Sequence, residues 1–199
     1  MATKIMVIRH AEKPNGLPGV LEDGSTRDDE SLTSVGWARA KALVQLFDPA
    51  GGVFADRRLA RPDKLFATVP NQKSQSLRPI ETITPLARDL GKTIDERFGE
   101  GDEKELAVAA ANASGVALVA WHHEKIPKLA KHILGSLDGV PQHWDDGRFD
   151  LVWTFDRAAD GTWSFAQVPQ LVMSGDSNLP IPLMQNDQGA ARDSQTHST

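Results

Sequence analysis

The chain of 199 residues contains no cysteine. Disulfide bonds and thiolate metal sites are therefore excluded, which fits a reducing compartment and predicts a cytoplasmic location. The sequence also lacks an apolar run that approaches the ~20 residues of a membrane span, and we expect no membrane association. A formal net charge of −5 provides no general basic surface for nucleic acid or an anionic membrane. Any anion that the protein binds is therefore held by a few local cations.

Three continuous apolar runs predict strands that are buried on both faces, as in a parallel sheet covered by helices. They cover residues 5–8, 65–68 and 116–121. Helical patterns alternate with these strands, which favours an α/β fold: a three-layer α/β/α sandwich with a mostly parallel central sheet. From Phe149 onward, two strand patterns around a polar turn predict a hairpin that adds antiparallel strands at the sheet edge. We expect one domain over residues 1–184 and a disordered tail over residues 185–199.

Four helices are expected, three of them between the strands. They cover residues 34–47, 79–90 and 102–114, and a fourth begins near residue 127. Thr33 is the expected N-cap of the first helix, and Pro85 predicts a kink or break in the second. In the third, Asp102 and Glu105 have the spacing of a capping box, and Gly115 is the expected end.

Charged and imidazole side chains directly follow two of the predicted strands. Arg9 and His10 come after the first strand, and His122 and His123 come after the strand of residues 116–121. Ligands of parallel α/β sheets bind in the crevice beyond the carboxyl ends of the strands, so these side chains are expected to meet there. Arg78 stands at a predicted helix start, where free backbone N–H groups and the helix dipole favour an anion. The pattern predicts a phosphate pocket.

These residue types suit phosphoryl transfer. A neutral imidazole can attack phosphorus and carry the phosphoryl group, provided that a hydrogen bond fixes which ring nitrogen is free. Arginine supplies permanently charged, forked donors for the phosphoryl oxygens. A second histidine can donate to the same oxygens, and a carboxylic acid must protonate the leaving oxygen. Such a site needs no metal ion.

Four segments of the chain resemble the histidine phosphatase superfamily, also called phosphoglycerate mutase-like. They are RHAEKP at residues 9–14, LTSVGWARAKAL at 32–43, SQSLRPIETITPLA at 74–87 and VALVAWHHEKI at 116–126. The first segment has Ala11 where the family usually has glycine, as in a branch that reads RHAE. Each segment alone is a weak signal, but the four occur in the family's order. The resemblance runs from about Lys4 to Leu134 and implies a phosphatase that needs no cofactor.

Carried over position by position, the resemblance implies site roles for five residues. His10 is the phosphorylated nucleophile, and Arg9 and Arg78 bind the phosphate. The resemblance favours His123 as the second catalytic histidine, with His122 as the alternative or as a phosphate-binding neighbour.

The proton donor has three candidates in the same resemblance. Mutase-like members carry a glutamate after the helix that Arg78 starts, in a segment that DERFGEG partly resembles, which nominates Glu96 or else Glu100. In the acid phosphatase branch an acidic residue follows the second histidine, which nominates Glu124.

We therefore expect a metal-independent phosphatase that hydrolyses a phosphomonoester, either a small molecule or a phosphorylated protein, through phosphohistidine. A phosphoglycerate mutase is disfavoured because 199 residues leave little room for the insertions that shape its substrate pocket. A metal-dependent hydrolase is disfavoured because arginine beside the histidines repels a cation. A non-catalytic phosphate-binding protein on the same fold is a third alternative. The sequence patterns do not reveal the substrate or the oligomeric state.

Overall fold

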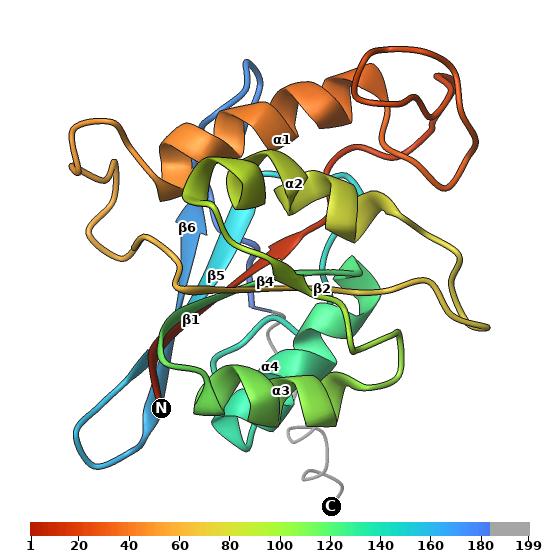
Figure 1. The fold of residues 1–199 in the computed structure, drawn as a ribbon. Coiled ribbons are helices and arrows are strands. Elements are labelled where there is room, and N and C mark those ends of the chain that lie inside the picture. The colour runs from red at the N-terminus through yellow and green to blue at the C-terminus, as the bar shows by residue number, and fades with distance from the viewer. Residues whose placement is uncertain (184–199) are drawn as a thin grey trace, which may run out of the picture.

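A mixed β-sheet lies between two layers of helices in the computed structural model, which describes residues 1–183 (Figure 1). The strands are β1 (Ala2–Arg9), β2 (Lys64–Ala67), β3 (Ile94–Asp95), β4 (Gly115–Trp121), β5 (Leu151–Arg157) and β6 (Trp163–Pro169). The helices are α1 (Ser34–Phe47), α2 (Arg78–Leu90), α3 (Glu103–Asn112), the 3-10 helix η1 (His123–Lys125) and α4 (Ile126–Leu134). The predicted tail of residues 185–199 lies outside the described residues.

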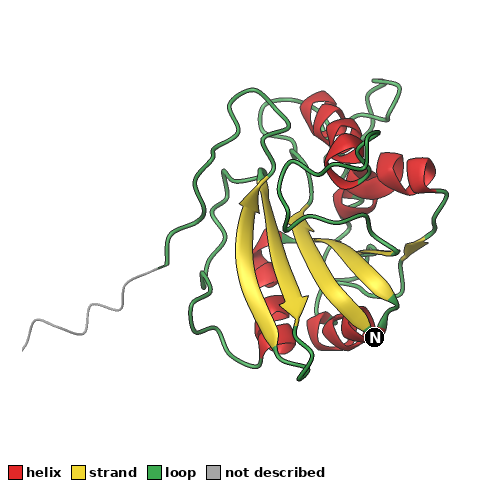
Figure 2. Cartoon of the chain, turned by 90° about the vertical axis from the view of Figure 1, so that its left-hand side faces the viewer, coloured by secondary structure: helices red, strands yellow, loops and turns green. Residues whose placement is uncertain are grey.

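The strand order in the sheet is β3-β2-β4-β1-β5-β6. The four strands from β3 to β1 are parallel to their neighbours, β5 pairs antiparallel with β1, and β6 pairs antiparallel with β5. Figure 2 shows the two hairpin strands as neighbouring arrows of opposite direction. The predicted parallel sheet with an antiparallel hairpin at its edge is confirmed.

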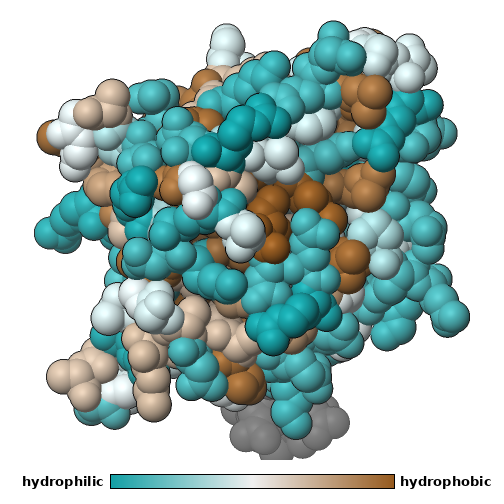
Figure 3. All heavy atoms as spheres, in the orientation of Figure 1, coloured by the Kyte–Doolittle hydropathy of each residue, from teal (hydrophilic) through white to brown (hydrophobic). Residues whose placement is uncertain are grey.

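Each face of the sheet has its own hydrophobic core. Met6 and Ile8 pack with α1 and α2, whereas Ile5 and Val7 pack with α3 and α4, as the two-residue period of a strand requires. On the side shown in Figure 3, hydrophobic residues are visible between the two helix layers, at the level of the sheet. The three-layer α/β/α sandwich is therefore confirmed. No helix within residues 1–183 is long and apolar enough to cross a membrane.

The first two predicted helices agree with the structure except at Pro85. The Thr33 hydroxyl accepts a hydrogen bond from the Gly36 N–H at 3.2 Å, which confirms the N-cap. Of the two alternatives predicted at Pro85, the break is absent, because helix α2 runs through this residue. A proline removes one backbone hydrogen bond, and burial of its neighbours Ile83 and Leu86 offsets that loss.

The third helix differs from its prediction at both ends. Asp102 makes no side-chain cap; its carboxylate accepts from the Gly99 N–H at 2.9 Å, and Glu103 accepts from the Gly101 N–H at 3.0 Å. The acidic residues thus hold the turn before the helix, and the predicted capping box is wrong. Gly115, with φ of 72°, begins β4 instead of ending the helix. The two-residue strand β3 is too short to show an apolar pattern.

Gly36 is predicted to be required for packing. A Cβ at this position would lie 2.7 Å from the Glu12 carbonyl oxygen, which belongs to the loop directly after His10. Gly36→Ala is therefore expected to destabilise the protein by about 1–3 kcal/mol, because backbone must move. Gly51→Ala is the matched control, since no atom lies within 4 Å of its new Cβ. Chemical unfolding measures both, and equal stability of the two variants would contradict the prediction.

Candidate active site

His10 is buried just beyond the carboxyl end of β1, with 3% of its surface exposed. Its backbone N–H donates to the Trp121 carbonyl at 3.1 Å and so continues the pairing of β1 with β4. The ring Nδ1 lies 2.7 Å from the Ala11 carbonyl oxygen, which can only accept, so Nδ1 carries the hydrogen and Nε2 is free. Burial and the Arg9 charge lower the pKa of His10 well below 6.5. The imidazole is therefore neutral at neutral pH.

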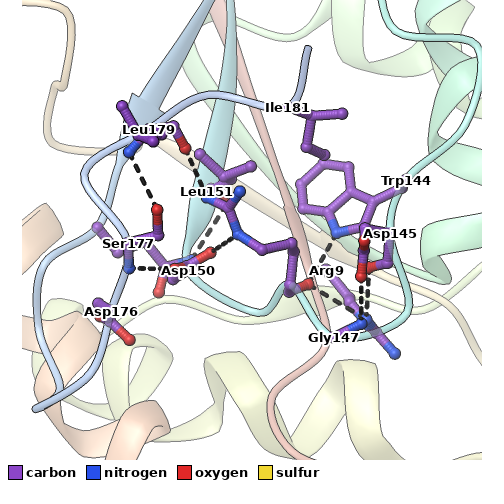
Figure 4. Close-up of polar contacts among 12 residues, drawn as sticks. Arg9, Trp144, Asp145, Gly147, Asp150, Leu151, Asp176, Ser177, Leu179 and Ile181 are labelled. Carbon is purple, nitrogen blue, oxygen red and sulfur yellow. Dashed lines mark hydrogen bonds and ion pairs between the residues drawn. The ribbon is translucent and has the colours of Figure 1, made fainter.

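Arg9 is enclosed by the loop that precedes β5. Its guanidinium stacks on the Phe149 ring, 3.9 Å from the centroid. Nη1 donates to the carbonyl oxygens of Asp146, Arg148 and Asp145 at 2.6, 3.2 and 3.3 Å. Figure 4 shows Arg9 beside Asp145 and Gly147 of this loop. Nε and Nη2 are buried and have no partner in the structure of residues 1–183. Burial lowers the pKa of Arg9 to about 10, so it stays charged at neutral pH.

Arg78 stands at the first position of α2. Its Nη1 donates to the Asp29 carbonyl at 2.6 Å, while Nε is buried without a partner among the described atoms. The Thr82 hydroxyl, one turn later, donates to the Arg78 carbonyl at 2.7 Å and accepts from the Ala11 N–H at 2.8 Å. The start of α2 is thereby tied to the residue that follows His10.

His122 and His123 are both buried beyond the carboxyl end of β4. Their ring centroids lie 5.9 and 6.5 Å from that of His10. The two rings differ in their partners: His122 Nε2 is buried and unpaired within the described chain, whereas His123 Nε2 lies 2.5 Å from Asp146 Oδ1. Burial lowers the pKa of both imidazoles. The nitrogen available to a ligand in this structure therefore belongs to His122, whereas the sequence favours His123.

The three predicted carboxylates have different surroundings. Glu124 is exposed, and its Oε1 lies 3.9 Å from His123 Nε2. Glu100 is half-buried and forms an ion pair with Lys125 at 3.4 Å. Glu96 is exposed in the segment between β3 and α3, and none of the contacts described for residues 1–183 links it to the histidines.

The loop directly before β5 also contributes to this site. The sequence patterns do not predict this contribution. Because β5 is antiparallel to β1, its start lies beside the carboxyl end of β1. Arg148 donates to the Asp150 carboxylate and to the Leu179 carbonyl, both at 2.7 Å, and the Ser177 N–H donates to Asp150 at 2.6 Å. Figure 4 shows how these bonds fasten the loop to the chain after β6. The strand-pairing direction is the signal that identifies this loop.

Arg39, from the second resembling segment, is buried in an ionic network. Its guanidinium donates to Glu12 at 2.9 Å, to Asp176 at 2.8 Å and to the Gln170 side chain at 3.0 Å. Glu12 is two residues after His10 in the sequence. Arg39 therefore positions the loop after the nucleophile and joins it to the chain after β6.

Two cavities open beside the site. One of about 370 Å³ is lined by Phe149 and Asp146, and one of about 590 Å³ is lined by Arg78 and Asp29. Lys13 lines both. Among residues 1–183, no three histidine, aspartate or glutamate side chains gather closely enough to hold a metal ion.

The three neutral histidines are expected to make stability depend on pH. Since burial lowers the pKa of His10, His122 and His123 below 6.5, the unfolded chain takes up protons first as the pH falls below 6.5. The free energy of unfolding should therefore decrease by about 1.4 kcal/mol per pH unit for each histidine, until its folded-state pKa is reached. Unfolding in denaturant between about pH 7.5 and pH 5.5 measures this loss. His122→Gln should show a smaller loss, and an unchanged loss would contradict the account.

Comparisons of the fold identify structures of the same architecture. No protein-family model and no curated protein matches the sequence. A mycobacterial glucosyl-3-phosphoglycerate phosphatase superposes with a TM-score of 0.52 at 13% identity, over 82% of this chain and 97% of that one. A protein named mycobacterial hydrolase 1 gives 0.51 at 12% identity, over 82% and 96% of the two chains. A protein assigned as the phosphohistidine phosphatase SixA, from Agrobacterium tumefaciens, gives 0.50 at 20% identity, over 83% and 98%. The chain thus has the fold of the histidine phosphatase superfamily, as its sequence resemblance implies.

Proposed function

We propose that this protein is a metal-independent phosphatase that hydrolyses a phosphomonoester through a phosphohistidine on His10. The observation that carries this proposal is that four of the buried nitrogen atoms without partners in the described chain belong to residues that act electrostatically on His10: Arg9 Nε and Nη2, Arg78 Nε and His122 Nε2. Leaving a buried donor unpaired costs about 1–3 kcal/mol, so such donors are expected to have a ligand. The charges of Arg9 and Arg78 and the neighbouring His122 ring all lower the pKa of His10.

The roles follow from the chemistry of an in-line attack. His10 Nε2 attacks phosphorus, while Nδ1–H stays bonded to the Ala11 carbonyl. Arg9 and Arg78 donate to the phosphoryl oxygens and stabilise the charge that spreads over them. We assign His122, with its unpaired Nε2, as the third donor to these oxygens. Water then attacks the phosphohistidine from the side that the leaving group has vacated and releases inorganic phosphate.

The proposal specifies the reaction but not the substrate. One protein of similar fold is assigned as a phosphohistidine phosphatase and another is a phosphatase of a glucosylated phosphoglycerate. These different substrates support phosphate-ester or phosphoramidate hydrolysis and favour neither a small molecule nor a phosphorylated protein. Mutase activity has no observation of its own to support it here.

The test is hydrolysis of 4-nitrophenyl phosphate by the purified protein with excess chelator present. We expect turnover that resists the chelator and is inhibited by vanadate, which occupies a phosphate site as a transition-state mimic. Loss of activity on chelation would overturn the metal-free mechanism. Vanadate binding without turnover of several phosphomonoesters would favour the non-catalytic phosphate-binding alternative.

A further inference from the structure

Asp146 is a carboxylate beside the site that the resemblance does not nominate. Its Oδ1 lies 2.5 Å from His123 Nε2, and its backbone carbonyl accepts from Arg9 at 2.6 Å. The residue is thus joined to two members of the site through different atoms. Its side chain is nevertheless 77% exposed, because it lines the cavity of about 370 Å³.

Phe149 lies between this cavity and the nucleophile. The Phe149 ring lines the cavity and lies 6.2 Å from the His10 ring, and the Arg9 guanidinium stacks on it. In an in-line displacement, the leaving oxygen lies on the side of phosphorus opposite the attacking nitrogen, a few ångströms farther from His10. A leaving group that points from a phosphate held by Arg9 into this cavity meets the Asp146 carboxylate, which lines it.

We propose that Asp146 is the proton donor of the leaving oxygen and that His123 is its positioning residue, which deepens the proposed phosphatase function and rests on it. In the first step, the P–O bond breaks as His10 Nε2 bonds to phosphorus, and the Asp146 proton passes to the leaving oxygen. In the second step, the water oxygen bonds to phosphorus as the bond to His10 Nε2 breaks, and Asp146 takes a proton from the attacking water. His123 holds the other carboxyl oxygen through its Nε2–H throughout.

The paired histidines of the sequence thereby have separate tasks. His122 has a free Nε2 for the phosphate, and His123 directs its Nε2 to Asp146. Glu124 is farther from the same nitrogen, at 3.9 Å. The hydrogen bond from His123 lowers the pKa of Asp146, so the protonated carboxyl that donates to the leaving oxygen is present only at acid pH. Arg9, Lys13 and Glu124 are the other charged groups that act on the pair.

The experiment compares two phosphate esters that differ in whether the leaving oxygen must be protonated. The alcohol of glycerol phosphate is a poor leaving group and must be protonated, whereas 4-nitrophenolate leaves as an anion. At acid pH, Asp146→Asn is expected to lower kcat for glycerol phosphate by about 10²–10⁴-fold and kcat for 4-nitrophenyl phosphate by less than about 10-fold. The alkaline fall in the wild-type rate with glycerol phosphate should disappear in this variant. Asp89→Asn, at an exposed position of α2, is the control for loss of one carboxylate and should match the wild type with both esters.

Each other outcome is decisive. An equal loss with both esters, or no loss with either, overturns the proton-donor role of Asp146 and leaves the phosphohistidine mechanism standing. A selective loss with glycerol phosphate in Glu124→Gln and not in Asp146→Asn assigns the donor to Glu124 and overturns the proposal. A wild type that hydrolyses neither ester overturns the proposed function and the donor role together.

Discussion

Replacing His10 by alanine is expected to lower kcat for 4-nitrophenyl phosphate by about 10⁴–10⁶-fold, since the proposed acceptor of the phosphoryl group is lost. His10 Nδ1 is fixed by the Ala11 carbonyl at 2.7 Å, so only Nε2 is free to attack. Phosphate binding should change much less, because the proposed donors are on Arg9, Arg78 and His122. Steady-state kinetics and inhibition by inorganic phosphate measure the two effects separately.

The control for this substitution is His132→Ala. His132 is exposed on α4, and its loss should leave kcat unchanged. Activity of His10→Ala above about one tenth of the wild type would show that His10 is not the nucleophile. A parallel loss of phosphate inhibition and kcat would instead assign His10 a binding role.

Arg9→Lys is expected to lower kcat/KM by about 10²–10⁴-fold, although the charge is retained. Arg9 uses Nη1 for the loop carbonyls and keeps Nε and Nη2 for a ligand, a division that a single ammonium nitrogen cannot reproduce. Lysine can satisfy either the Asp146 carbonyl or the phosphate. The lysine variant should therefore lose both vanadate affinity and stability, the latter by about 1–3 kcal/mol through the carbonyls left unpaired.

Arg61→Lys provides the comparison for Arg9→Lys. Arg61 is a half-exposed residue that pairs with Asp48 at 2.8 Å, and its replacement should change stability by less than about 0.5 kcal/mol and leave kcat/KM unchanged. Retention of vanadate affinity in Arg9→Lys would contradict the account of Arg9 as a forked phosphate donor.

The parts of the site that local patterns predict are those that follow a recognisable element. Arg9, His10 and the two histidines after β4 stand at strand ends, and Arg78 stands at a helix start. Residues at such points share one edge of a parallel sheet, whatever the details of the loops. Their convergence could therefore be anticipated from the order of apolar runs alone.

The contribution of the loop before β5 depends on information that a local pattern does not contain. Asp146 and Phe149 reach the site because β5 pairs antiparallel with β1, in the register that places Ile8 opposite Val152. A hairpin predicted from sequence could pair with any exposed strand of the sheet. The different roles of His122 and His123 similarly depend on which ring contacts Asp146. The fold of the loop before β5 determines this contact.

The predicted helix ends show a related limit. Asp102 and Glu105 have the spacing of a capping box, but the Asp102 carboxylate binds the Gly99 N–H instead. Short-range spacing identifies which groups can cap, and competition with nearby turn N–H groups decides whether they do.

Trapping the covalent intermediate tests directly whether His10 carries the phosphoryl group. The protein would be mixed with 4-nitrophenyl phosphate and quenched within one turnover in alkali, because phosphohistidine is stable there. The quenched protein would then be digested for mass spectrometry. The account predicts a phosphoryl group on the peptide that contains His10 and none in His10→Ala. A phosphoryl group on another residue, or hydrolysis with inversion at phosphorus and no phosphorylated peptide, would contradict it.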